Sequence, residues 1–393
     1  MSQPTDAPRP AGEPAAIGVG MVGYAFMGRA HSQAWNTVGR VFDLPLRPRL
    51  AAICGRDKAA AEAAAGRLGW AAAETDWRAL IARDDVQLVD IAAPGDLHAP
   101  VAIAALAAGK HVLCEKPLAN TLAEAEAMQA AAGAAYPRGA RAMVGFNYRR
   151  VPALALARRL VEQGRIGRLR HFRAVYLQDW LADPDAPMTW RMQAERAGSG
   201  ALGDLGAHIV DLARYLTGDE ITGVSAISAT FVRERPLADG PGSGTVTVDD
   251  AVVFTGRLAS GALASFEVTR FATGRKNGLR VELNGSAGSL AFDLERLNEL
   301  EVFSVAPGDG DTAGFRRVLV TEATHPYLDA WWPPGHTLGW EHTFTHQAKD
   351  LLTAIAAGDQ PSPSFADGLA VQRVLDAVAR SAASGNSWES VRG

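Results

Sequence analysis

The sequence is poor in cysteine, since Cys54 and Cys114 are the only two among its 393 residues. Two cysteines cannot build a disulfide scaffold and fit no zinc-binding spacing, so we expect two free thiols and no metal site. Because structural disulfides are rare in reducing compartments, their absence favours a cytoplasmic protein.

Long apolar runs and concentrated charge are also missing. No apolar stretch approaches the roughly 18 residues that a membrane-spanning helix needs. The N-terminus lacks the basic and apolar regions of a signal peptide, and the Pro, Ala and Gly of residues 1–14 predict a flexible tail. The net charge is −4 and no block of Lys or Arg stands out. We therefore expect neither nucleic acid nor a membrane as a partner.

The chain does contain enough apolar material, 48% of its residues, for two globular domains. Near the start, AIGVGMVGYAFMGRAHS (16–32) holds the pattern G-x-G-x-x-G in two frames. The first frame uses Gly18, Gly20 and Gly23, and the second uses Gly23, Ala25 and Gly28. A dinucleotide loop needs a strand before it and a helix after it. Only the second frame leaves room for a strand, at 16–22, so we expect the phosphates over residues 24–28.

Strands and helices alternate after this loop. Strands are predicted at 49–54, 86–94, 111–117 and 141–147, with helices at 57–69, 76–85, 98–110 and 121–133 between them. This rhythm predicts a parallel, doubly wound Rossmann domain over residues 15–148, with strand order 3-2-1-4-5-6. Ligands of such sheets bind at the carboxyl ends of the strands.

The rhythm changes near residue 150. After a helix at 152–164, a strand at 170–178 and a helix near 204–217, strands follow one another at 224–232, 249–258, 262–271, 279–286 and 288–294. Two helices, at 338–357 and 366–384, close the chain. The short turns between the strands predict a large, mainly antiparallel open sheet in an α+β domain over residues 149–393.

Two motifs carry chemistry. In CEKP, Lys116 follows a parallel strand and would face the nicotinamide end of a dinucleotide. In GDLGAH, Asp204 and His208 are four residues apart, so on a helix they share one face. A carboxylate beside an imidazole fixes its tautomer and raises its basicity, which suits a general base. A salt-bridged lysine, a capping aspartate and a buried core histidine are the structural alternatives.

Together with "AAPGDLHAPVAIAALAAGKHVLCEKPLA", "GFNYRR" and "PGHTLGWEHTF", these motifs resemble the Gfo/Idh/MocA family of oxidoreductases along nearly the whole chain. The resemblance implies an NAD(P)-binding domain and a second domain that supplies most of the substrate pocket and often the oligomer interface. It implies that Lys116 orients the substrate hydroxyl and that His208 is the general base. Asp204 would hydrogen-bond the substrate and Lys116. The chain has Gly95 where many relatives have asparagine in Thr-Pro-Asn.

The expected cofactor contacts, on these grounds, are Gly23, Tyr24, Ala25, Phe26, Met27, Gly28, Arg56, Ala93, Pro94, His98, Glu115 and Lys116. The end of the second strand leaves the choice of cofactor open. Gly55 and Arg56 come before Asp57, so a 2′-phosphate could be accommodated, yet Arg56 could also stack on the adenine of NAD. We expect NAD, without excluding NADP.

Polar and aromatic residues before the 204–217 helix suggest the substrate. The expected contacts are Lys116, Tyr148, Gln178, Trp180, Arg191, Asp204, His208 and, from the loop before the last helices, His336. Flat aromatic faces with polar groups suit a sugar or cyclitol ring, although the tryptophans could instead pack in the core. Within the family, QDW…WR…AGSG…GDLGAH resembles levoglucosan dehydrogenases and related sugar 3-dehydrogenases or inositol dehydrogenases.

The resemblance thus implies an NAD(P)-dependent dehydrogenase that oxidises a secondary hydroxyl of a sugar, an anhydrosugar or a cyclitol. It would act as a homodimer or homotetramer. Two other functions remain open on the same scaffold: an NAD-dependent glycoside hydrolase, which oxidises its substrate only transiently, and a non-catalytic NAD(P) sensor. Lys116, Asp204 and His208 argue against the sensor, which has no need of groups that transfer protons.

Overall fold

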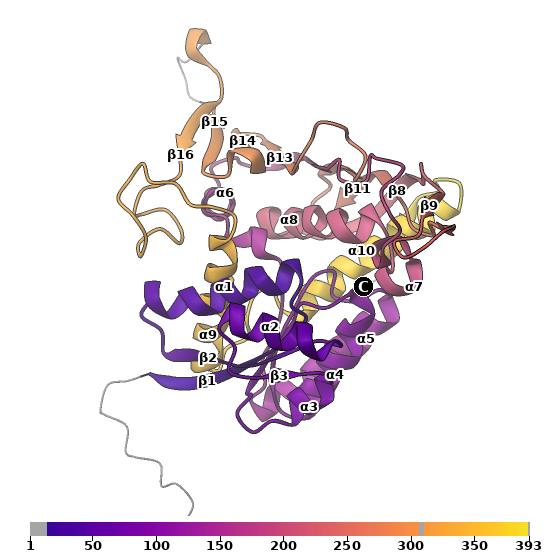
Figure 1. The fold of residues 1–393 in the computed structure, drawn as a ribbon. Coiled ribbons are helices and arrows are strands. Elements are labelled where there is room, and N and C mark those ends of the chain that lie inside the picture. The colour runs from indigo at the N-terminus through magenta and orange to yellow at the C-terminus, as the bar shows by residue number, and fades with distance from the viewer. Residues whose placement is uncertain (1–13, 306–309, 392–393) are drawn as a thin grey trace, which may run out of the picture.

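The structure, a computed structural model, describes residues 14–305 and 310–391. The predicted tail at 1–14 therefore lies outside the described residues, except for Pro14. Two sheets organise the chain, a parallel one below and a larger one above (Figure 1). Among the described residues, no helix combines the length and apolarity needed to span a bilayer.

The first sheet is the predicted doubly wound sheet, and its strand order β3-β2-β1-β4-β5-β6 confirms the prediction. All its strands pair in parallel. They are β1 (Ala15–Val22), β2 (Leu46–Cys54), β3 (Ala73–Glu74), β4 (Leu88–Ile91), β5 (His111–Cys114) and β6 (Ala142–Val144). Every residue of β1 from Ile17 onward is buried, as expected for a strand that is covered by helices on both faces.

Helices connect these strands: α1 (Phe26–Val41), α2 (Lys58–Leu68), α3 (Trp77–Ala82), α4 (His98–Ala107) and α5 (Leu122–Ala135). Side chains in the sequence define several of their starts. The Asp57 carboxylate accepts the N–H of Ala60 at the start of α2, and Thr121 and Glu124 form a capping box at the start of α5. In contrast, α1 begins at Ala25 without a side-chain cap.

The second sheet has nine strands in the order β16-β15-β14-β13-β7-β12-β11-β8-β17. Its strands are β7 (Leu169–Leu177), β8 (Ile221–Ala229), β11 (Ala251–Leu258), β12 (Leu263–Thr269), β13 (Gly278–Gly285), β14 (Gly288–Asp293), β15 (Glu299–Ser304), β16 (Arg316–Leu319) and β17 (Glu389–Ser390). Only the β7–β12 pair is parallel, which confirms a mainly antiparallel sheet. A separate hairpin joins β9 (Glu234–Pro236) and β10 (Ser243–Thr245).

Several predicted strands end earlier than expected, among them β4, β5 and β6, and one strand is shifted as a whole. The strand expected at 224–232 begins three residues earlier and ends at Ala229. The Asp250 carboxylate accepts the N–H groups of Phe231 and Val232, so these residues bend out of the sheet. Strands β3, β9, β10, β15, β16 and β17 were not predicted, and β16 and β17 form the two edges of the large sheet.

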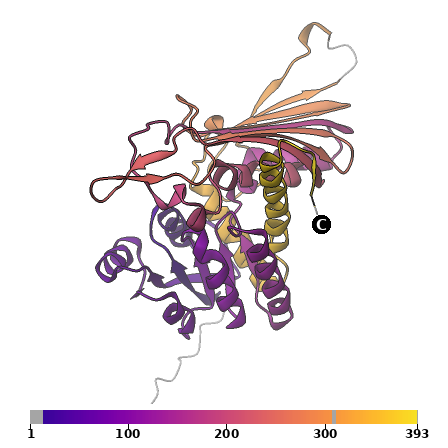
Figure 2. The ribbon, with the colours of Figure 1, turned by 90° about the vertical axis from the view of Figure 1, so that its right-hand side faces the viewer.

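Helices lie between the two sheets. They are α6 (Pro152–Glu162), α7 (Ala194–Ala197), α8 (Ala207–Thr217), α9 (His342–Ala357) and α10 (Phe365–Ala383). Figure 2 shows α10, in yellow, between the large sheet and the first domain, where it contacts both β8 and α5. Helix α9 returns to the parallel sheet and packs against α1 and β2. The carboxyl ends of the parallel strands thus face the helical layer of the second domain.

Candidate active site

The loop between β1 and α1 has the geometry that the second glycine frame requires. Gly23 has φ +103°, and a Cβ atom there would lie 2.6 Å from the Ala92 carbonyl oxygen. A Cβ atom on Gly28 would lie 2.3 Å from the Gly23 oxygen, so the helix can pack this closely only with glycine. Gly18 and Gly20 lie inside β1, as predicted for residues of a strand.

The first turn of α1 fits a negatively charged group. Ala25 offers no side-chain acceptor, and the turn contains no acidic residue. The first N–H groups of a helix have no partner within the helix, and together with the helix dipole they attract a phosphate. Phe26 is 55% exposed and stacks on Trp340, with ring centroids 5.5 Å apart. The residues present therefore fit the diphosphate of a dinucleotide.

A cavity of about 530 Å³ opens beside this loop, between the ends of the parallel strands and the second domain. Most of the predicted residues line it: Ala25, Phe26, Met27, Ala93, Pro94, His98, Glu115, Lys116, Tyr148, Gln178, Trp180, Arg191, Asp204 and His208. The cavity therefore brings the loop, the CEKP motif and the Asp204–His208 pair into one site.

Five predicted residues lie outside the cavity wall. Gly23, Tyr24 and Gly28 shape the loop, and Arg56 is exposed beyond the end of β2. The fifth is His336, whose exposed ring lies 2.9 Å from the Pro333 carbonyl oxygen within its own turn. From that loop it is Trp340 that reaches the cavity.

Lys116 and Asp204 form the central ion pair of the cavity. The Lys116 Nζ atom donates to the Asp204 Oδ1 atom at 3.0 Å and to its carbonyl oxygen at 2.9 Å. Asp204 lies in a π-helical turn, Leu202–Gly206, which leads into α8. Burial alone would raise the pKa of Asp204, but the charges of Lys116 and Arg270 outweigh it and lower the pKa to about 2. The carboxylate is therefore ionised at neutral pH.

His208 lies in the first turn of α8, among aromatic rings. Its ring centroid is 4.5 Å from that of Tyr148 and 5.8 Å from that of Tyr176. Its Nδ1 atom is buried and has no hydrogen-bond partner among the described residues. Burial and the Lys116 charge hold the pKa of His208 well below 6.5, so the imidazole is neutral and can accept a proton.

The charge of Asp204 does raise the pKa of His208, as expected, but burial and the charge of Lys116 outweigh it. The Asp204 carboxylate bonds Lys116, and the pKa of His208 is lowered rather than raised. Asp204 lies in the π-helical turn, which ends at Gly206, whereas His208 lies in α8, so the two residues do not sit on one regular α-helix as the spacing assumed. The ammonium group of Lys116 also offers the carboxylate a stronger partner than a neutral imidazole does.

A chain of hydrogen bonds forms the wall opposite the loop. Because Tyr176 donates its only hydroxyl proton to Asn277 Oδ1 at 2.8 Å, Tyr148 must be the donor in its 2.8 Å bond to Tyr176. Gln178 Nε2 donates to the same Asn277 oxygen, and Trp180 Nε1 donates to Gln178 Oε1 at 2.9 Å. This wall combines aromatic faces with polar edges, as a sugar ring requires.

Several cavity residues were not among the predicted contacts, and Arg270 and Asn147 are two of them. Arg270 follows the last residue of β12 and is only 1% exposed, with its guanidinium 5.4 Å from the Trp180 ring centroid. Asn147, within the quoted GFNYRR motif, also lines the cavity and donates to Thr343 Oγ1. The sequence feature that could have indicated Arg270 is an arginine that directly follows a strand of alternating apolar residues.

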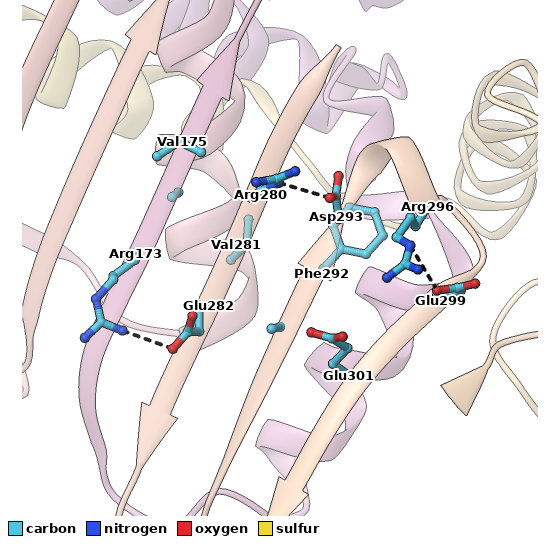
Figure 3. A pocket seen from close by; sticks show the side chains of 12 residues that line it. Arg173, Val175, Arg280, Val281, Glu282, Phe292, Asp293, Arg296, Glu299 and Glu301 are labelled. Atoms are coloured by element: carbon cyan, nitrogen blue, oxygen red, sulfur yellow. Dashed lines mark hydrogen bonds and ion pairs between the residues drawn. The ribbon is translucent and has the colours of Figure 1, made fainter. Parts of the chain in front are cut away.

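A second, smaller cavity of about 330 Å³ lies on the outer face of the large sheet (Figure 3). Six of its charged side chains form three ion pairs, Arg173 with Glu282, Arg280 with Asp293 and Arg296 with Glu299, and Glu301 also lines it. Because most of these charges pair with one another and the Lys116, Asp204 and His208 set lines the larger cavity, the larger cavity is the candidate active site. Within residues 14–305 and 310–391, no cluster of potential metal ligands occurs.

Comparisons with known proteins agree with this geometry. Residues 17–146 match the oxidoreductase family with an NAD-binding Rossmann fold (GFO_IDH_MocA), and residues 154–291 match the GFO/IDH/MocA C-terminal domain. The resemblance found in the motifs is thereby confirmed. The levoglucosan dehydrogenase of Pseudarthrobacter phenanthrenivorans is 44% identical over 95% of this chain and 98% of that protein.

Two solved structures share the whole architecture. The crystal structure of an oxidoreductase domain protein from Kribbella flavida has a TM-score of 0.93 and 62% identity, over 96% of this chain and 100% of that one. A levoglucosan dehydrogenase in complex with NADH and levoglucosan has a TM-score of 0.91 and 45% identity, over 96% and 99% of the two chains.

Proposed function

Because the chain belongs to the Gfo/Idh/MocA family and is an NAD-dependent oxidoreductase, we propose that it oxidises a secondary hydroxyl group of a sugar-like substrate to a ketone. The substrate class is a sugar, an anhydrosugar such as levoglucosan, or a cyclitol. One observation carries the proposal: the Lys116–Asp204 pair and the neutral imidazole of His208 line the same cavity as the start of α1.

The cofactor supplies a nicotinamide ring that accepts the hydride. The protein supplies the rest. A lysine ammonium group has three N–H donors, and two of those of Lys116 point at Asp204. The third is free to bond the substrate hydroxyl oxygen and to stabilise the negative charge that develops there. His208 receives the hydroxyl proton, for which its lowered pKa keeps it deprotonated.

Residues around the cavity would hold the substrate. Tyr148, Gln178 and Arg191 offer hydroxyl, amide and guanidinium groups, and Trp180 offers a flat face. The levoglucosan complex of the 45% identical dehydrogenase supports a ligand of this class. We also propose that the predicted cofactor contacts Gly23–Gly28, Arg56, Ala93, Pro94, His98 and Glu115 hold NAD. The Asp57 carboxylate caps α2, so Arg56 is the charged side chain that remains at the end of β2 to face the ribose. Because a basic residue there can accommodate a 2′-phosphate, NADP has to be tested directly beside NAD.

Assembly and location are part of the proposal. Exposed Ile227 and Val253 lie opposite each other on β8 and β11, on the outer face of the large sheet. A homodimer or homotetramer would cover this apolar area. The free thiols of Cys54 and Cys114 fit a cytoplasmic enzyme. Sedimentation of the full chain measures the oligomeric state, and a monomer would overturn this part.

The central test follows the absorbance of NADH while the protein is mixed with NAD or NADP and a panel of anhydrosugars, sugars and inositols. Net formation of NADH with one of them is expected. A glycoside hydrolase would instead cleave a glycoside without net NADH, and a sensor would bind the cofactor without turnover. Either result would replace the proposed dehydrogenase.

A further inference from the structure

A buried cluster of charged groups lies directly behind the cavity. His31, in α1, is only 2% exposed, and each of its ring nitrogens contacts a carboxylate. Its Nδ1 atom is 3.0 Å from both oxygens of Asp90, and its Nε2 atom is 3.0 Å from Glu115 Oε1. Asp90 also accepts the indole N–H of Trp35 at 2.7 Å. The mechanism proposed above uses neither His31 nor Asp90.

The geometry indicates that His31 is an imidazolium ion. A neutral imidazole has a single N–H group, whereas two carboxylates approach the two nitrogens of His31. Burial alone would lower the pKa of His31, but Asp90 and Glu115 outweigh it and raise the pKa to about 10. The imidazolium therefore compensates part of the charge of two buried carboxylates, which would be costly without it.

Glu115 connects this cluster to the active site. Its Oε1 atom bonds His31, and its Oε2 atom accepts the backbone N–H of Lys116 at 3.3 Å. The carboxylate lies against Gly145, where a Cβ atom would be only 2.7 Å from Oε1. Glu115 thus has little freedom to move, and the peptide that carries Lys116 is tied to it.

A histidine also lies beside the end of this segment. The carbonyl oxygen of Pro117 is 2.9 Å from Nδ1 of His98, whose Nε2 atom is 3.1 Å from the Ala93 carbonyl oxygen. Burial lowers the pKa of His98, so its neutral ring has a single N–H that can bond only one of these two carbonyl oxygens. The bond from the Lys116 N–H to Glu115 does not depend on that choice. The free end of Lys116 then reaches Asp204 across the cavity.

We infer that His31 is a positioning residue for the reaction: through Glu115 it fixes the backbone from which Lys116 reaches the substrate. This inference rests on the proposed role of Lys116. A displacement of a reacting group by about 1 Å can cost on the order of 100-fold in rate. Loss of the His31–Glu115 bond would lower kcat without removing any group that binds the sugar.

The test compares His31→Gln, Glu115→Gln and the double variant in the full-length protein. His346→Gln is the matched control, because His346 is also fully buried but bonds Arg150 and Trp331 instead. Hydrogen exchange of the segment 111–120 should accelerate in the first three variants and remain unchanged in the control. With the sugar that the wild type oxidises, kcat should fall about 10- to 100-fold in each single variant, with KM for the sugar within about threefold.

The double variant decides whether His31 acts through Glu115. If it does, the double variant loses no more kcat than Glu115→Gln alone; multiplied losses would overturn the inference. Unchanged exchange in 111–120, or an equal effect of His346→Gln, would overturn it as well. If His31→Gln does not fold, a variant that combines His31→Gln with Asp90→Asn replaces it, because the second change removes the carboxylate charge that His31→Gln leaves unpaired. A wild-type protein that oxidises no sugar would refute the proposed function. Hydrogen exchange can be measured without turnover, so its result would still test whether His31 fixes the segment that carries Lys116.

Discussion

Two substitutions in the glycine-rich stretch should separate stability from cofactor binding. Ala25→Leu places a larger side chain on an exposed residue that lines the cavity beside the first N–H groups of α1. Gly20→Ala adds one methyl group inside β1 instead. We expect the first variant to lose NADH binding and keep its stability, and the second to do the reverse.

The contacts set the expected magnitudes. A Cβ atom on Gly20 would lie 2.7 Å from Leu80 Cδ2 and 2.9 Å from Val86 Cγ1, so both side chains must shift. Overpacking of this kind costs about 1–3 kcal/mol. The side chain introduced by Ala25→Leu faces solvent, so its effect on the free energy of unfolding should stay within about 0.5 kcal/mol. Blocking the phosphate position should weaken NADH binding at least about 100-fold, or roughly 2.7 kcal/mol.

The assay is a titration of each variant with NADH, followed by energy transfer from tryptophan, beside thermal unfolding without cofactor. Gly20→Ala should lower Tm by about 2–4 °C for each kcal/mol lost. Its dissociation constant for NADH should match that of the wild type. Lost NADH binding in a folded Gly20→Ala protein, with Ala25→Leu unaffected, would show that the first glycine frame holds the phosphates.

Three further results are expected. Lys116→Ala should lower kcat by about 10²- to 10⁴-fold, while its affinity for NADH stays near that of the wild type. The control variant Lys349→Ala, on α9 and away from the cavity, should leave kcat and NADH affinity unchanged. Near-normal turnover of Lys116→Ala would contradict the role of Lys116. Because His208 must be deprotonated to accept a proton and its pKa is lowered by burial and Lys116, the acid limb of kcat/KM should lie well below pH 6.5, and a limb at 6.5 or above would contradict the assignment. Nitrogen NMR of labelled histidines should show His31 protonated from pH 6 through 8, because Asp90 and Glu115 raise its pKa to about 10 despite burial. The ion pairs of His31 stabilise the fold fully below pH 6.5, and this stabilisation is lost as the pH rises through 10. A titration midpoint of His31 near pH 6.5 would refute the imidazolium.

Local patterns in the sequence were sufficient for much of the fold. The strand at 16–22 and the helix after it follow from an apolar run of the right length and the glycine loop behind it. The alternation of strands and helices indicated the doubly wound fold and hence its strand order, although the two-residue strand β3 left no signal. Strands β16 and β17, at the two edges of the large sheet, were missed because they have only four and two residues. Such strands form only because a sheet edge is already present to pair with them.

The sequence by itself determined which chemical groups the site contains: the glycine loop, Lys116, Asp204 and His208. Tertiary structure decided how they pair. Asp204, in the π-helical turn, and Lys116, directly after β5, meet in space and form an ion pair. Burial and the Lys116 charge lower the pKa of His208 and keep its imidazole neutral. His31 could not be singled out, because its two carboxylate partners lie 59 and 84 residues away along the chain. Spacing in the sequence reports neighbours on one element, whereas charge pairing and desolvation depend on which elements meet in space.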